Sequence, residues 1–229
     1  MQKQAKQKSD IIVLFMKYFF PVICIAALVY GCILLVPEIR NRRDASAVKG
    51  ITDDQLSDEA VGRIIIDNTS INYPIMQGEN NFKYLNTSPT GENSLVGSIF
   101  LDYRNSSDFS DDYSIIYGHH MKGDYMFGPL EKFLDMKYLQ NHRTGLIELS
   151  THEFKEINVF ACLVVPGDDA NIFELDYCED LWAYIQTHTD VFMEYYGGKI
   201  VALTTCKDTD SDDRIIVMTE ILGSSKEVI

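Results

Sequence analysis

A possible nucleophile, Cys206, and a cation that could assist it, Arg214, stand at facing ends of two predicted strands. Residues 200–205 and 215–222 form short apolar runs rich in β-branched side chains, which is typical of strands. A polar loop separates them, so the strands most simply pair antiparallel and bring both side chains to one end of a sheet. A cation near a thiol favours the thiolate that attacks, and a guanidinium suits a developing oxyanion. The alternative is a buried structural cysteine beside a surface arginine.

A cysteine nucleophile needs a base, and the chain has five histidines. His119 and His120 follow the strand-like run 113–117 and Gly118. A glycine at a strand end lets the backbone turn sharply and present the next side chain. The remaining histidines are His142, His152 and His188. Their polar surroundings hold no other ligands at metal spacing, which predicts surface histidines and no metal site.

Two motifs together resemble the sortases, which are membrane-anchored cysteine transpeptidases of Gram-positive bacteria. They are Thr204-Thr205-Cys206 followed by Arg214, and Tyr117-Gly118-His119-His120. The stretch 97–105, Gly-Ser-Ile-Phe-Leu-Asp-Tyr-Arg-Asn, and the pair Met126-Phe127 are similar to class B sortases in particular. The resemblance extends over residues 52–222.

The resemblance implies a catalytic site made of Cys206, His119 and Arg214. Cys206 would attack the carbonyl after Thr in a sorting signal of the type Asn-Pro-x-Thr-Gly or Asn-Pro-x-Thr-Asn and form a thioacyl enzyme. An amine of the cell-wall peptide, or of a pilin, would then resolve the intermediate. His119 would serve as acid and base, in preference to His120, because the catalytic histidine of the family directly follows the glycine. Arg214 would bind the substrate carbonyl and its oxyanion.

The resemblance also implies substrate contacts and partners. The residues that match groove positions of class B sortases are Asn81, Leu85, Ile172 and Thr204. For Leu85 and Ile172, ordinary core packing is the alternative. The expected partners are surface proteins with a C-terminal sorting signal, and an amine of the peptidoglycan cross-bridge or a pilin lysine as acceptor. No cofactor is implied.

An uncharged stretch from Tyr18 to Val36 is long enough to cross a bilayer as a helix. We expect a cytoplasmic tail over 1–10, a transmembrane helix over 11–37, a linker over 38–50 and an extracellular catalytic domain over 51–229. Basic residues flank the stretch on both sides, so the positive-inside rule is ambiguous. The polar domain that follows and the resemblance favour a single-pass protein of the cell membrane with its N-terminus in the cytoplasm. A buried core helix, a cleaved signal peptide and a lipoprotein cleavage box at 29–32 are the alternatives.

The charge balance argues against nucleic acid as a partner. The chain carries a formal net charge of −14 at pH 7, although its N-terminal part is basic. The domain after the apolar stretch is therefore strongly acidic and repels phosphate backbones and anionic lipid surfaces.

Many short strands and few helices predict a barrel or a sandwich. Besides the C-terminal pair, the strand-like runs are 64–66, 71–76, 98–101, 114–117, 146–149 and 157–165. Helical patterns cover 126–140 and 179–194, and the capping-box residues 52–55 predict a short helix to about Ala60. The resemblance implies a mainly β fold, with an eight-stranded sortase-type barrel, an N-terminal helix and an extra helix before the penultimate strand.

The other cysteines and the acidic loop leave two questions open. Cys162 lies in a fully apolar strand and Cys178 begins a helical segment, so a disulfide between them is one possibility. Asp208, Asp210 and the following acids fit the beginning of an EF-hand loop. The sixth position is aspartate instead of glycine and the twelfth is threonine instead of glutamate, which favours a solvated acidic loop over a calcium site.

Two other functions fit the same residues. A membrane-tethered cysteine peptidase would use the same chemistry but transfer the acyl group to water. A wall-associated binding module would use no chemistry, although the presence of Cys206, His119 and Arg214 weighs against it.

Overall fold

The computed structural model describes residues 2–175, 180–206 and 212–223. Cys178 and its pairing with Cys162, and Asp208 and Asp210 of the acidic loop, lie outside these ranges. The chain divides into two compact units, Met1–Arg43 and Asp44–Ile229.

The N-terminal helix α1 (Gln2–Lys49) is 48 residues long and contains Pro21 and Pro37. A window within Phe15–Lys49 has a mean hydropathy of 2.7, so this helix is long and apolar enough to cross a membrane. Helix α1 continues through most of the expected linker, where Arg42 bonds Glu38 one turn away at 2.9 Å. The segment 38–49 is therefore helical, and the domain boundaries at 10, 37 and 50 remain a prediction.

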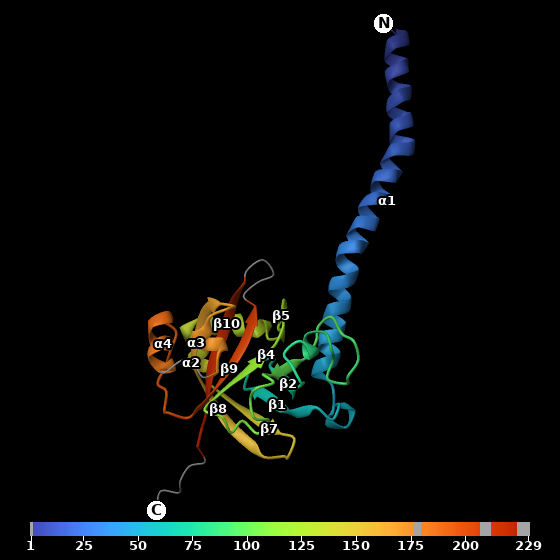
Figure 1. The fold of residues 1–229 in the computed structure, drawn as a ribbon. Helices are drawn as coiled ribbons and strands as arrows, with labels where there is room; N and C mark the ends of the chain where they lie inside the picture. The colour runs from blue at the N-terminus through green and yellow to red at the C-terminus, as the bar shows by residue number, and fades with distance from the viewer. Residues whose placement is uncertain (1, 176–179, 207–211, 224–229) are drawn as a thin grey trace, which may run out of the picture. The chain divides into compact units, whose positions relative to one another are not determined.

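Eight strands in the described part of the chain close into a barrel, as predicted (Figure 1). They are β1 (Ala60–Ile66), β2 (Asn72–Met76), β3 (Ile99–Leu101), β4 (Tyr113–Tyr117), β7 (Thr144–Leu149), β8 (Phe154–Pro166), β9 (Lys199–Cys206) and β10 (Asp213–Ile221). Their order around the barrel is β1-β2-β3-β4-β9-β10-β8-β7, and the antiparallel pairing of β1 with β7 closes it.

Two neighbouring pairs decide which residues share an edge of the barrel. Strands β9 and β10 pair antiparallel, as the sequence predicts, with Cys206 opposite Arg214. Strand β4 pairs with β9 in parallel, and Tyr117 lies opposite Thr204. Parallel neighbours end at the same edge of a sheet, so the C-terminal ends of β4 and β9 lie at one edge of the barrel.

Alternate residues of the C-terminal strands belong to two different cores. In β10, Ile215 and Val217 pack in the main core, whereas Ile216 and Met218 pack in a second core with Ile185 of helix α4 (Leu181–His188). Because both faces are buried, these strands read as continuous apolar runs instead of alternating ones. The barrel wall at β8, β9 and β10 is therefore held from both sides.

The helices outside the barrel cover this second face. They are α3 (Ala170–Phe173) and α4 (Leu181–His188), and Figure 1 shows them on the same side of the barrel. Helix α4 confirms the extra helix before the penultimate strand, but it is shorter than the expected 179–194. It ends at His188 because the backbone of Thr189 is extended, and Phe192 forms a β-bridge to Ala161.

Four short helical segments and one hairpin complete the described part of the domain. They are η1 (Asp53–Gln55), η2 (Lys83–Leu85), η3 (Gly128–Leu134), α2 (Met136–Asn141) and the hairpin β5–β6 (His120–Met121 and Tyr125–Met126). The helix predicted from 52 to about Ala60 is wrong beyond Gln55, because Ala60 already pairs with Met76 in the barrel. The side chain of Gln55 does accept a bond from the Thr52 amide at 3.1 Å, as the capping-box pattern predicts.

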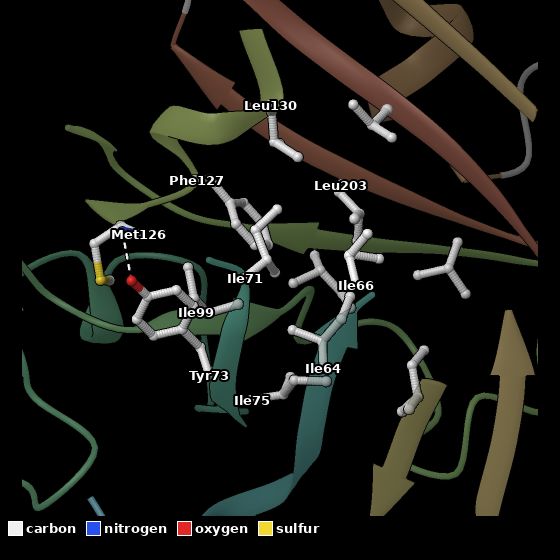
Figure 2. Close-up of a cluster of buried hydrophobic side chains, with 14 of the residues drawn as sticks. Ile64, Ile66, Ile71, Tyr73, Ile75, Ile99, Met126, Phe127, Leu130 and Leu203 are labelled. Carbon is white, nitrogen blue, oxygen red and sulfur yellow. Dashed lines mark hydrogen bonds between the residues drawn. The ribbon is translucent and has the colours of Figure 1, made fainter. Parts of the chain in front are cut away.

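The hairpin β5–β6 ends at Met126, a residue with a strained backbone that is hydrogen-bonded to the buried Tyr73. Met126 has a φ of 49°, which is left-handed and unfavourable for a side chain with a Cβ. Its amide donates to the hydroxyl of Tyr73 at 2.9 Å, and both residues are fully buried (Figure 2). Phe127, next in the chain, packs into the same core. The Tyr73 hydroxyl thus fixes the turn that brings Phe127 into the barrel.

We predict that Tyr73→Phe lowers the free energy of unfolding by about 1–3 kcal/mol, because it leaves the buried Met126 amide without an acceptor. Denaturant unfolding of the variant measures the loss. Tyr196→Phe is the matched control, since Tyr196 is 62% exposed and its change should stay within about 0.5 kcal/mol. Equal stabilities of the Tyr73→Phe variant and the parent would contradict this account.

Candidate active site

The strand register brings three predicted catalytic residues to one edge of the barrel. Tyr117 and Thr204 are partners in the parallel pair β4–β9, and His119 and Cys206 each lie two residues further along. Cys206 is also the ladder partner of Arg214, and ladder partners lie on the same face of a sheet. For Cys206 the structure describes the backbone. The sequence predicted the Cys206–Arg214 pair directly, whereas the approach of His119 depends on the β4–β9 pairing.

A cavity of about 570 Å³ lies at this edge. Its lining includes five of the predicted site residues, which are Asn81, Leu85, His119, Thr204 and Arg214. The remaining lining is Asn80, Phe82, Phe100, Tyr103, Arg104, Tyr117, Gly118, Gly167, Phe173, Glu174 and Thr205. A cavity of this volume, with aromatic walls and a few polar groups, suits a short peptide segment.

The backbone around His119 is closely fixed. A Cβ at Gly118 would lie 2.4 Å from Ile99 and 2.6 Å from the Phe127 ring, so only glycine fits there. The Phe127 amide donates to the His119 carbonyl at 3.1 Å. The ring atom Nε2 of His119 is 2.8 Å from the Leu85 carbonyl oxygen. Because a carbonyl only accepts, this bond needs the proton on Nε2 and leaves Nδ1 as the nitrogen that can take up another.

His120 points into different surroundings. Its Nε2 lies 3.8 Å from the Glu131 carboxylate, and its Nδ1 is buried without a hydrogen-bond partner in the described part of the chain. His120 does not line the cavity, whereas His119 does.

The guanidinium of Arg214 is anchored through main-chain groups. Its Nη1 donates to the carbonyls of Asp212 at 2.7 Å and Asp213 at 3.3 Å. A Cβ at Gly167 would come within 3.1 Å of the guanidinium carbon, so the absence of a side chain at Gly167 lets the group lie flat against the backbone. Within the described residues, these two carbonyls are its hydrogen-bond acceptors, which leaves other N–H groups for a ligand oxygen.

Two threonines of β9 add unused polar groups to the cavity. Thr204 and Thr205 are each 2% exposed, and neither hydroxyl has a hydrogen-bond partner among the described residues. A buried hydroxyl without a partner carries a desolvation cost that a bound ligand can relieve. The sequence predicted Thr204 as a contact and missed Thr205, although its position beside Cys206 was a usable signal.

Ile172 lies near the cavity but not in its lining. Its side chain is fully buried in the second core, and its carbonyl accepts a bond from the Tyr113 hydroxyl at 2.9 Å. The next residue, Phe173, reaches the cavity instead. Any role of Ile172 in binding would therefore act through the placement of Phe173.

The lining residues that were missed also include Tyr117, Arg104 and Phe173. Arg104 bonds the fully buried carboxylate of Asp102 at 2.9 Å. The signal in the sequence was the acid itself, because Asp102 directly follows the apolar run Ile99–Leu101, where a buried charge needs a partner.

The described residues contain no group of three or more His, Cys, Asp or Glu side chains that could hold a metal ion. The expected surface positions hold for His152 and His188, which are exposed, while His142 is half-buried and stacks on Tyr138 with ring centroids 3.8 Å apart. The calcium alternative concerns residues outside the described ranges and stays open.

Known proteins resemble this chain in sequence and in fold. The family model described as the sortase domain matches residues 64–222. Sortase B of Listeria monocytogenes is 35% identical over 179 residues, which cover 72% of each chain, and sortase B of Staphylococcus aureus is 31% identical over 185 residues, 75% of this chain and 74% of that one. A Streptococcus pyogenes class B sortase involved in pilus biogenesis has a similar structure, with a TM-score of 0.70, 37% identity and coverage of 76% of this chain and 100% of that one. The S. aureus sortase B–substrate complex gives a TM-score of 0.66 at 28% identity, over 75% of this chain and 83% of that one.

The reactivity of Cys162 can be predicted from its surroundings. It is fully buried in the main core, and this burial raises the pKa of its thiol far above the ordinary value. We predict that iodoacetamide at pH 8 leaves Cys162 unmodified in the native protein and modifies it after unfolding in denaturant. Peptide mapping by mass spectrometry measures both states, and rapid native modification of Cys162 would refute the buried position.

Proposed function

The chain belongs to the sortase family, class B, whose members are cysteine transpeptidases that act on sorting-signal substrates, and we propose that it cleaves a signal of the type Asn-Pro-x-Thr-Gly or Asn-Pro-x-Thr-Asn after the threonine. The acyl group is transferred to an amine of the peptidoglycan cross-bridge or to a pilin lysine. The single observation that supports this most is the register of β9, in which Cys206 is opposite Arg214 and Thr204 is opposite Tyr117, two residues before His119.

In the first half of the proposed reaction, the sulfur of Cys206 attacks the threonine carbonyl carbon, and the thiol proton passes to His119. The tetrahedral oxyanion is stabilised by N–H groups of Arg214 that the carbonyls of Asp212 and Asp213 do not use. The C–N bond then breaks, and His119 returns the proton to the leaving amine. The product of this half is a thioester on Cys206.

In the second half, an acceptor amine attacks the thioester and gives a proton to His119. The C–S bond breaks, a new amide forms, and Cys206 regains the proton from His119. The hydrogen bond from Nε2 of His119 to the Leu85 carbonyl supports this role, because it holds the ring while Nδ1 exchanges the proton.

For the peptide itself, we propose contacts from Asn81, Leu85 and Thr204, with Ile172 acting by way of Phe173. Asn81, Leu85 and Thr204 line the cavity, and the buried Thr204 hydroxyl has an unused hydrogen-bonding capacity in the described part of the chain. An extended peptide offers backbone amides and carbonyls at the spacing that such groups can satisfy.

We further propose that α1 anchors the protein in the cell membrane by a single pass, with the N-terminus in the cytoplasm and the catalytic domain outside. The apolar window in α1 supports the anchor, and the sorting-signal substrates of the family support an extracellular site. The partners are then surface proteins with a C-terminal sorting signal. A role in pilus assembly is described for the S. pyogenes relative.

A peptide assay tests the proposed activity. The full-length chain in detergent micelles is mixed with a library of Asn-Pro-x-Thr peptides, with triglycine or a lysine peptide as the acceptor. We predict an amide product that grows with the amine concentration and is absent for Cys206→Ala. His119→Ala should be inactive, whereas His120→Ala should retain activity because its ring faces Glu131 instead of the cavity. Release of free acid alone at every amine concentration would instead identify a peptidase.

The role of Arg214 makes a sharper prediction. Arg214→Lys keeps the charge but loses the planar set of donors, so kcat should fall on the order of 10²–10³. The protein should stay folded, with Cys206 still alkylated readily at neutral pH. Stopped-flow or discontinuous kinetics measure the loss, with Arg143→Lys as the control because Arg143 does not line the cavity. An Arg214→Lys enzyme within a few-fold of the parent would mean that Arg214 supplies only charge.

A further inference from the structure

Asp102 is a fully buried carboxylate immediately after β3, and it does not itself line the cavity. A buried carboxylate is costly unless hydrogen bonds compensate the lost water. Asp102 accepts bonds from the amide and Nε of Arg104 at 3.0 and 2.9 Å and from its Nη2 at 2.9 Å. It also accepts bonds from the Asn81 side-chain amide at 2.8 Å and from the Tyr117 hydroxyl at 3.0 Å.

The balance of these effects keeps Asp102 charged. Burial alone would raise its pKa, but the bonds from Arg104, Asn81 and Tyr117 outweigh it and hold the pKa below the ordinary value for aspartate. The same interaction raises the pKa of Arg104. Both groups are therefore ionised at neutral pH.

Arg104 extends the network to another part of the chain. Its Nη2 donates to the Phe173 carbonyl at 2.8 Å, and its Nη1 lies 3.4 Å from the Glu174 carboxylate. One guanidinium thus joins the buried acid after β3 to the segment that ends α3. An arginine can do this because its donors are fixed in a plane and point in several directions.

The partners of Asp102 and those of Arg104 in this network all reach the cavity. Asn81, Arg104, Tyr117, Phe173 and Glu174 belong to its lining. The Asn81 amide is also oriented, since its oxygen accepts the Tyr103 amide at 3.0 Å while its nitrogen binds Asp102. Three separate chain segments that shape the cavity therefore converge on one carboxylate.

We propose that Asp102 is a positioning residue for recognition of the sorting signal. It shapes the cavity by holding Asn81 and Tyr117 directly and the Phe173–Glu174 segment through Arg104. This proposal rests on the proposed function and adds to it a determinant of peptide binding that lies outside the Cys206, His119 and Arg214 chemistry. Loss of the Asp102 charge should therefore weaken peptide binding and leave the reacting groups in place.

The test compares Asp102→Asn with the parent in the full-length chain. Asparagine keeps the size of the side chain but removes the negative charge to which Arg104 and Asn81 both donate hydrogen bonds. We expect KM for the sorting peptide to rise about 10- to 100-fold, because misplacement of a positioning group costs up to about 10²-fold. We expect kcat to change less than about 3-fold, because the lost contacts bind the peptide equally in the ground state and the transition state. The alkylation rate of Cys206 should stay within about 2-fold.

Asp111→Asn is the matched control. The Asp111 carboxylate also accepts several bonds, from the Asn105 amide at 3.0 Å and from the Ser106 amide and hydroxyl at 2.7 and 2.8 Å. Asp111, Asn105 and Ser106 do not line the cavity, so the KM of Asp111→Asn should equal that of the parent. If Asp102→Asn fails to fold, Arg104→Gln replaces it, because Arg104 is 31% exposed and removing it breaks the bridge to Phe173.

A second measurement does not need activity. Amide hydrogen exchange of segments 81–85 and 172–174 should be faster in Asp102→Asn than in the parent, and unchanged in Asp111→Asn. A parent that cleaves no sorting peptide would defeat the proposed function, and exchange would still decide the role of Asp102. Unchanged exchange in both segments, an unchanged KM in an active enzyme, or a loss confined to kcat would overturn the proposal.

Discussion

The parallel pairing of β4 with β9 is the constraint on which the site depends. Its register sets Tyr117 opposite Thr204, and the residues two positions beyond each of them are His119 and Cys206. The antiparallel pairing of β10 then sets Arg214 opposite Cys206. A slip of one residue in either ladder would turn every side chain of the shifted strand to the other face, so the same hydrogen bonds that build the barrel also determine which residues meet at this edge.

The surroundings of these strand ends explain how the register is maintained. Ile215 and Val217 of β10 pack inside the barrel, and Ile216 and Met218 pack against the outer helices. A strand buried on both faces has two independent reasons to keep its register. The polar groups of the site appear only where the ladders end, and the carboxylate of Asp102 is buried with enough donors around it to keep its charge.

Local patterns predict most of the elements but not how they meet. The apolar runs at 200–205 and 215–222 predict β9, β10 and their pairing, because a short polar loop joins them. The neighbours β4 and β9 are far apart in the sequence, so no local signal brings His119 to Cys206, and the family resemblance supplied that step. The β5–β6 hairpin was missed because its strands have only two residues each, and the Asp102 network because it joins three distant segments.

The large sequence separation between β4 and β9 also affects when these strands can pair during synthesis of the chain. Most of the chain, including the crossover from β4 to β9, must be synthesised before the two strands can meet, and such non-local contacts form late because loop closure costs entropy. Arg214 comes later still, on the last strand of the barrel. A nascent chain can therefore contain both His119 and Cys206 before these residues are neighbours, and they come together only when the barrel closes.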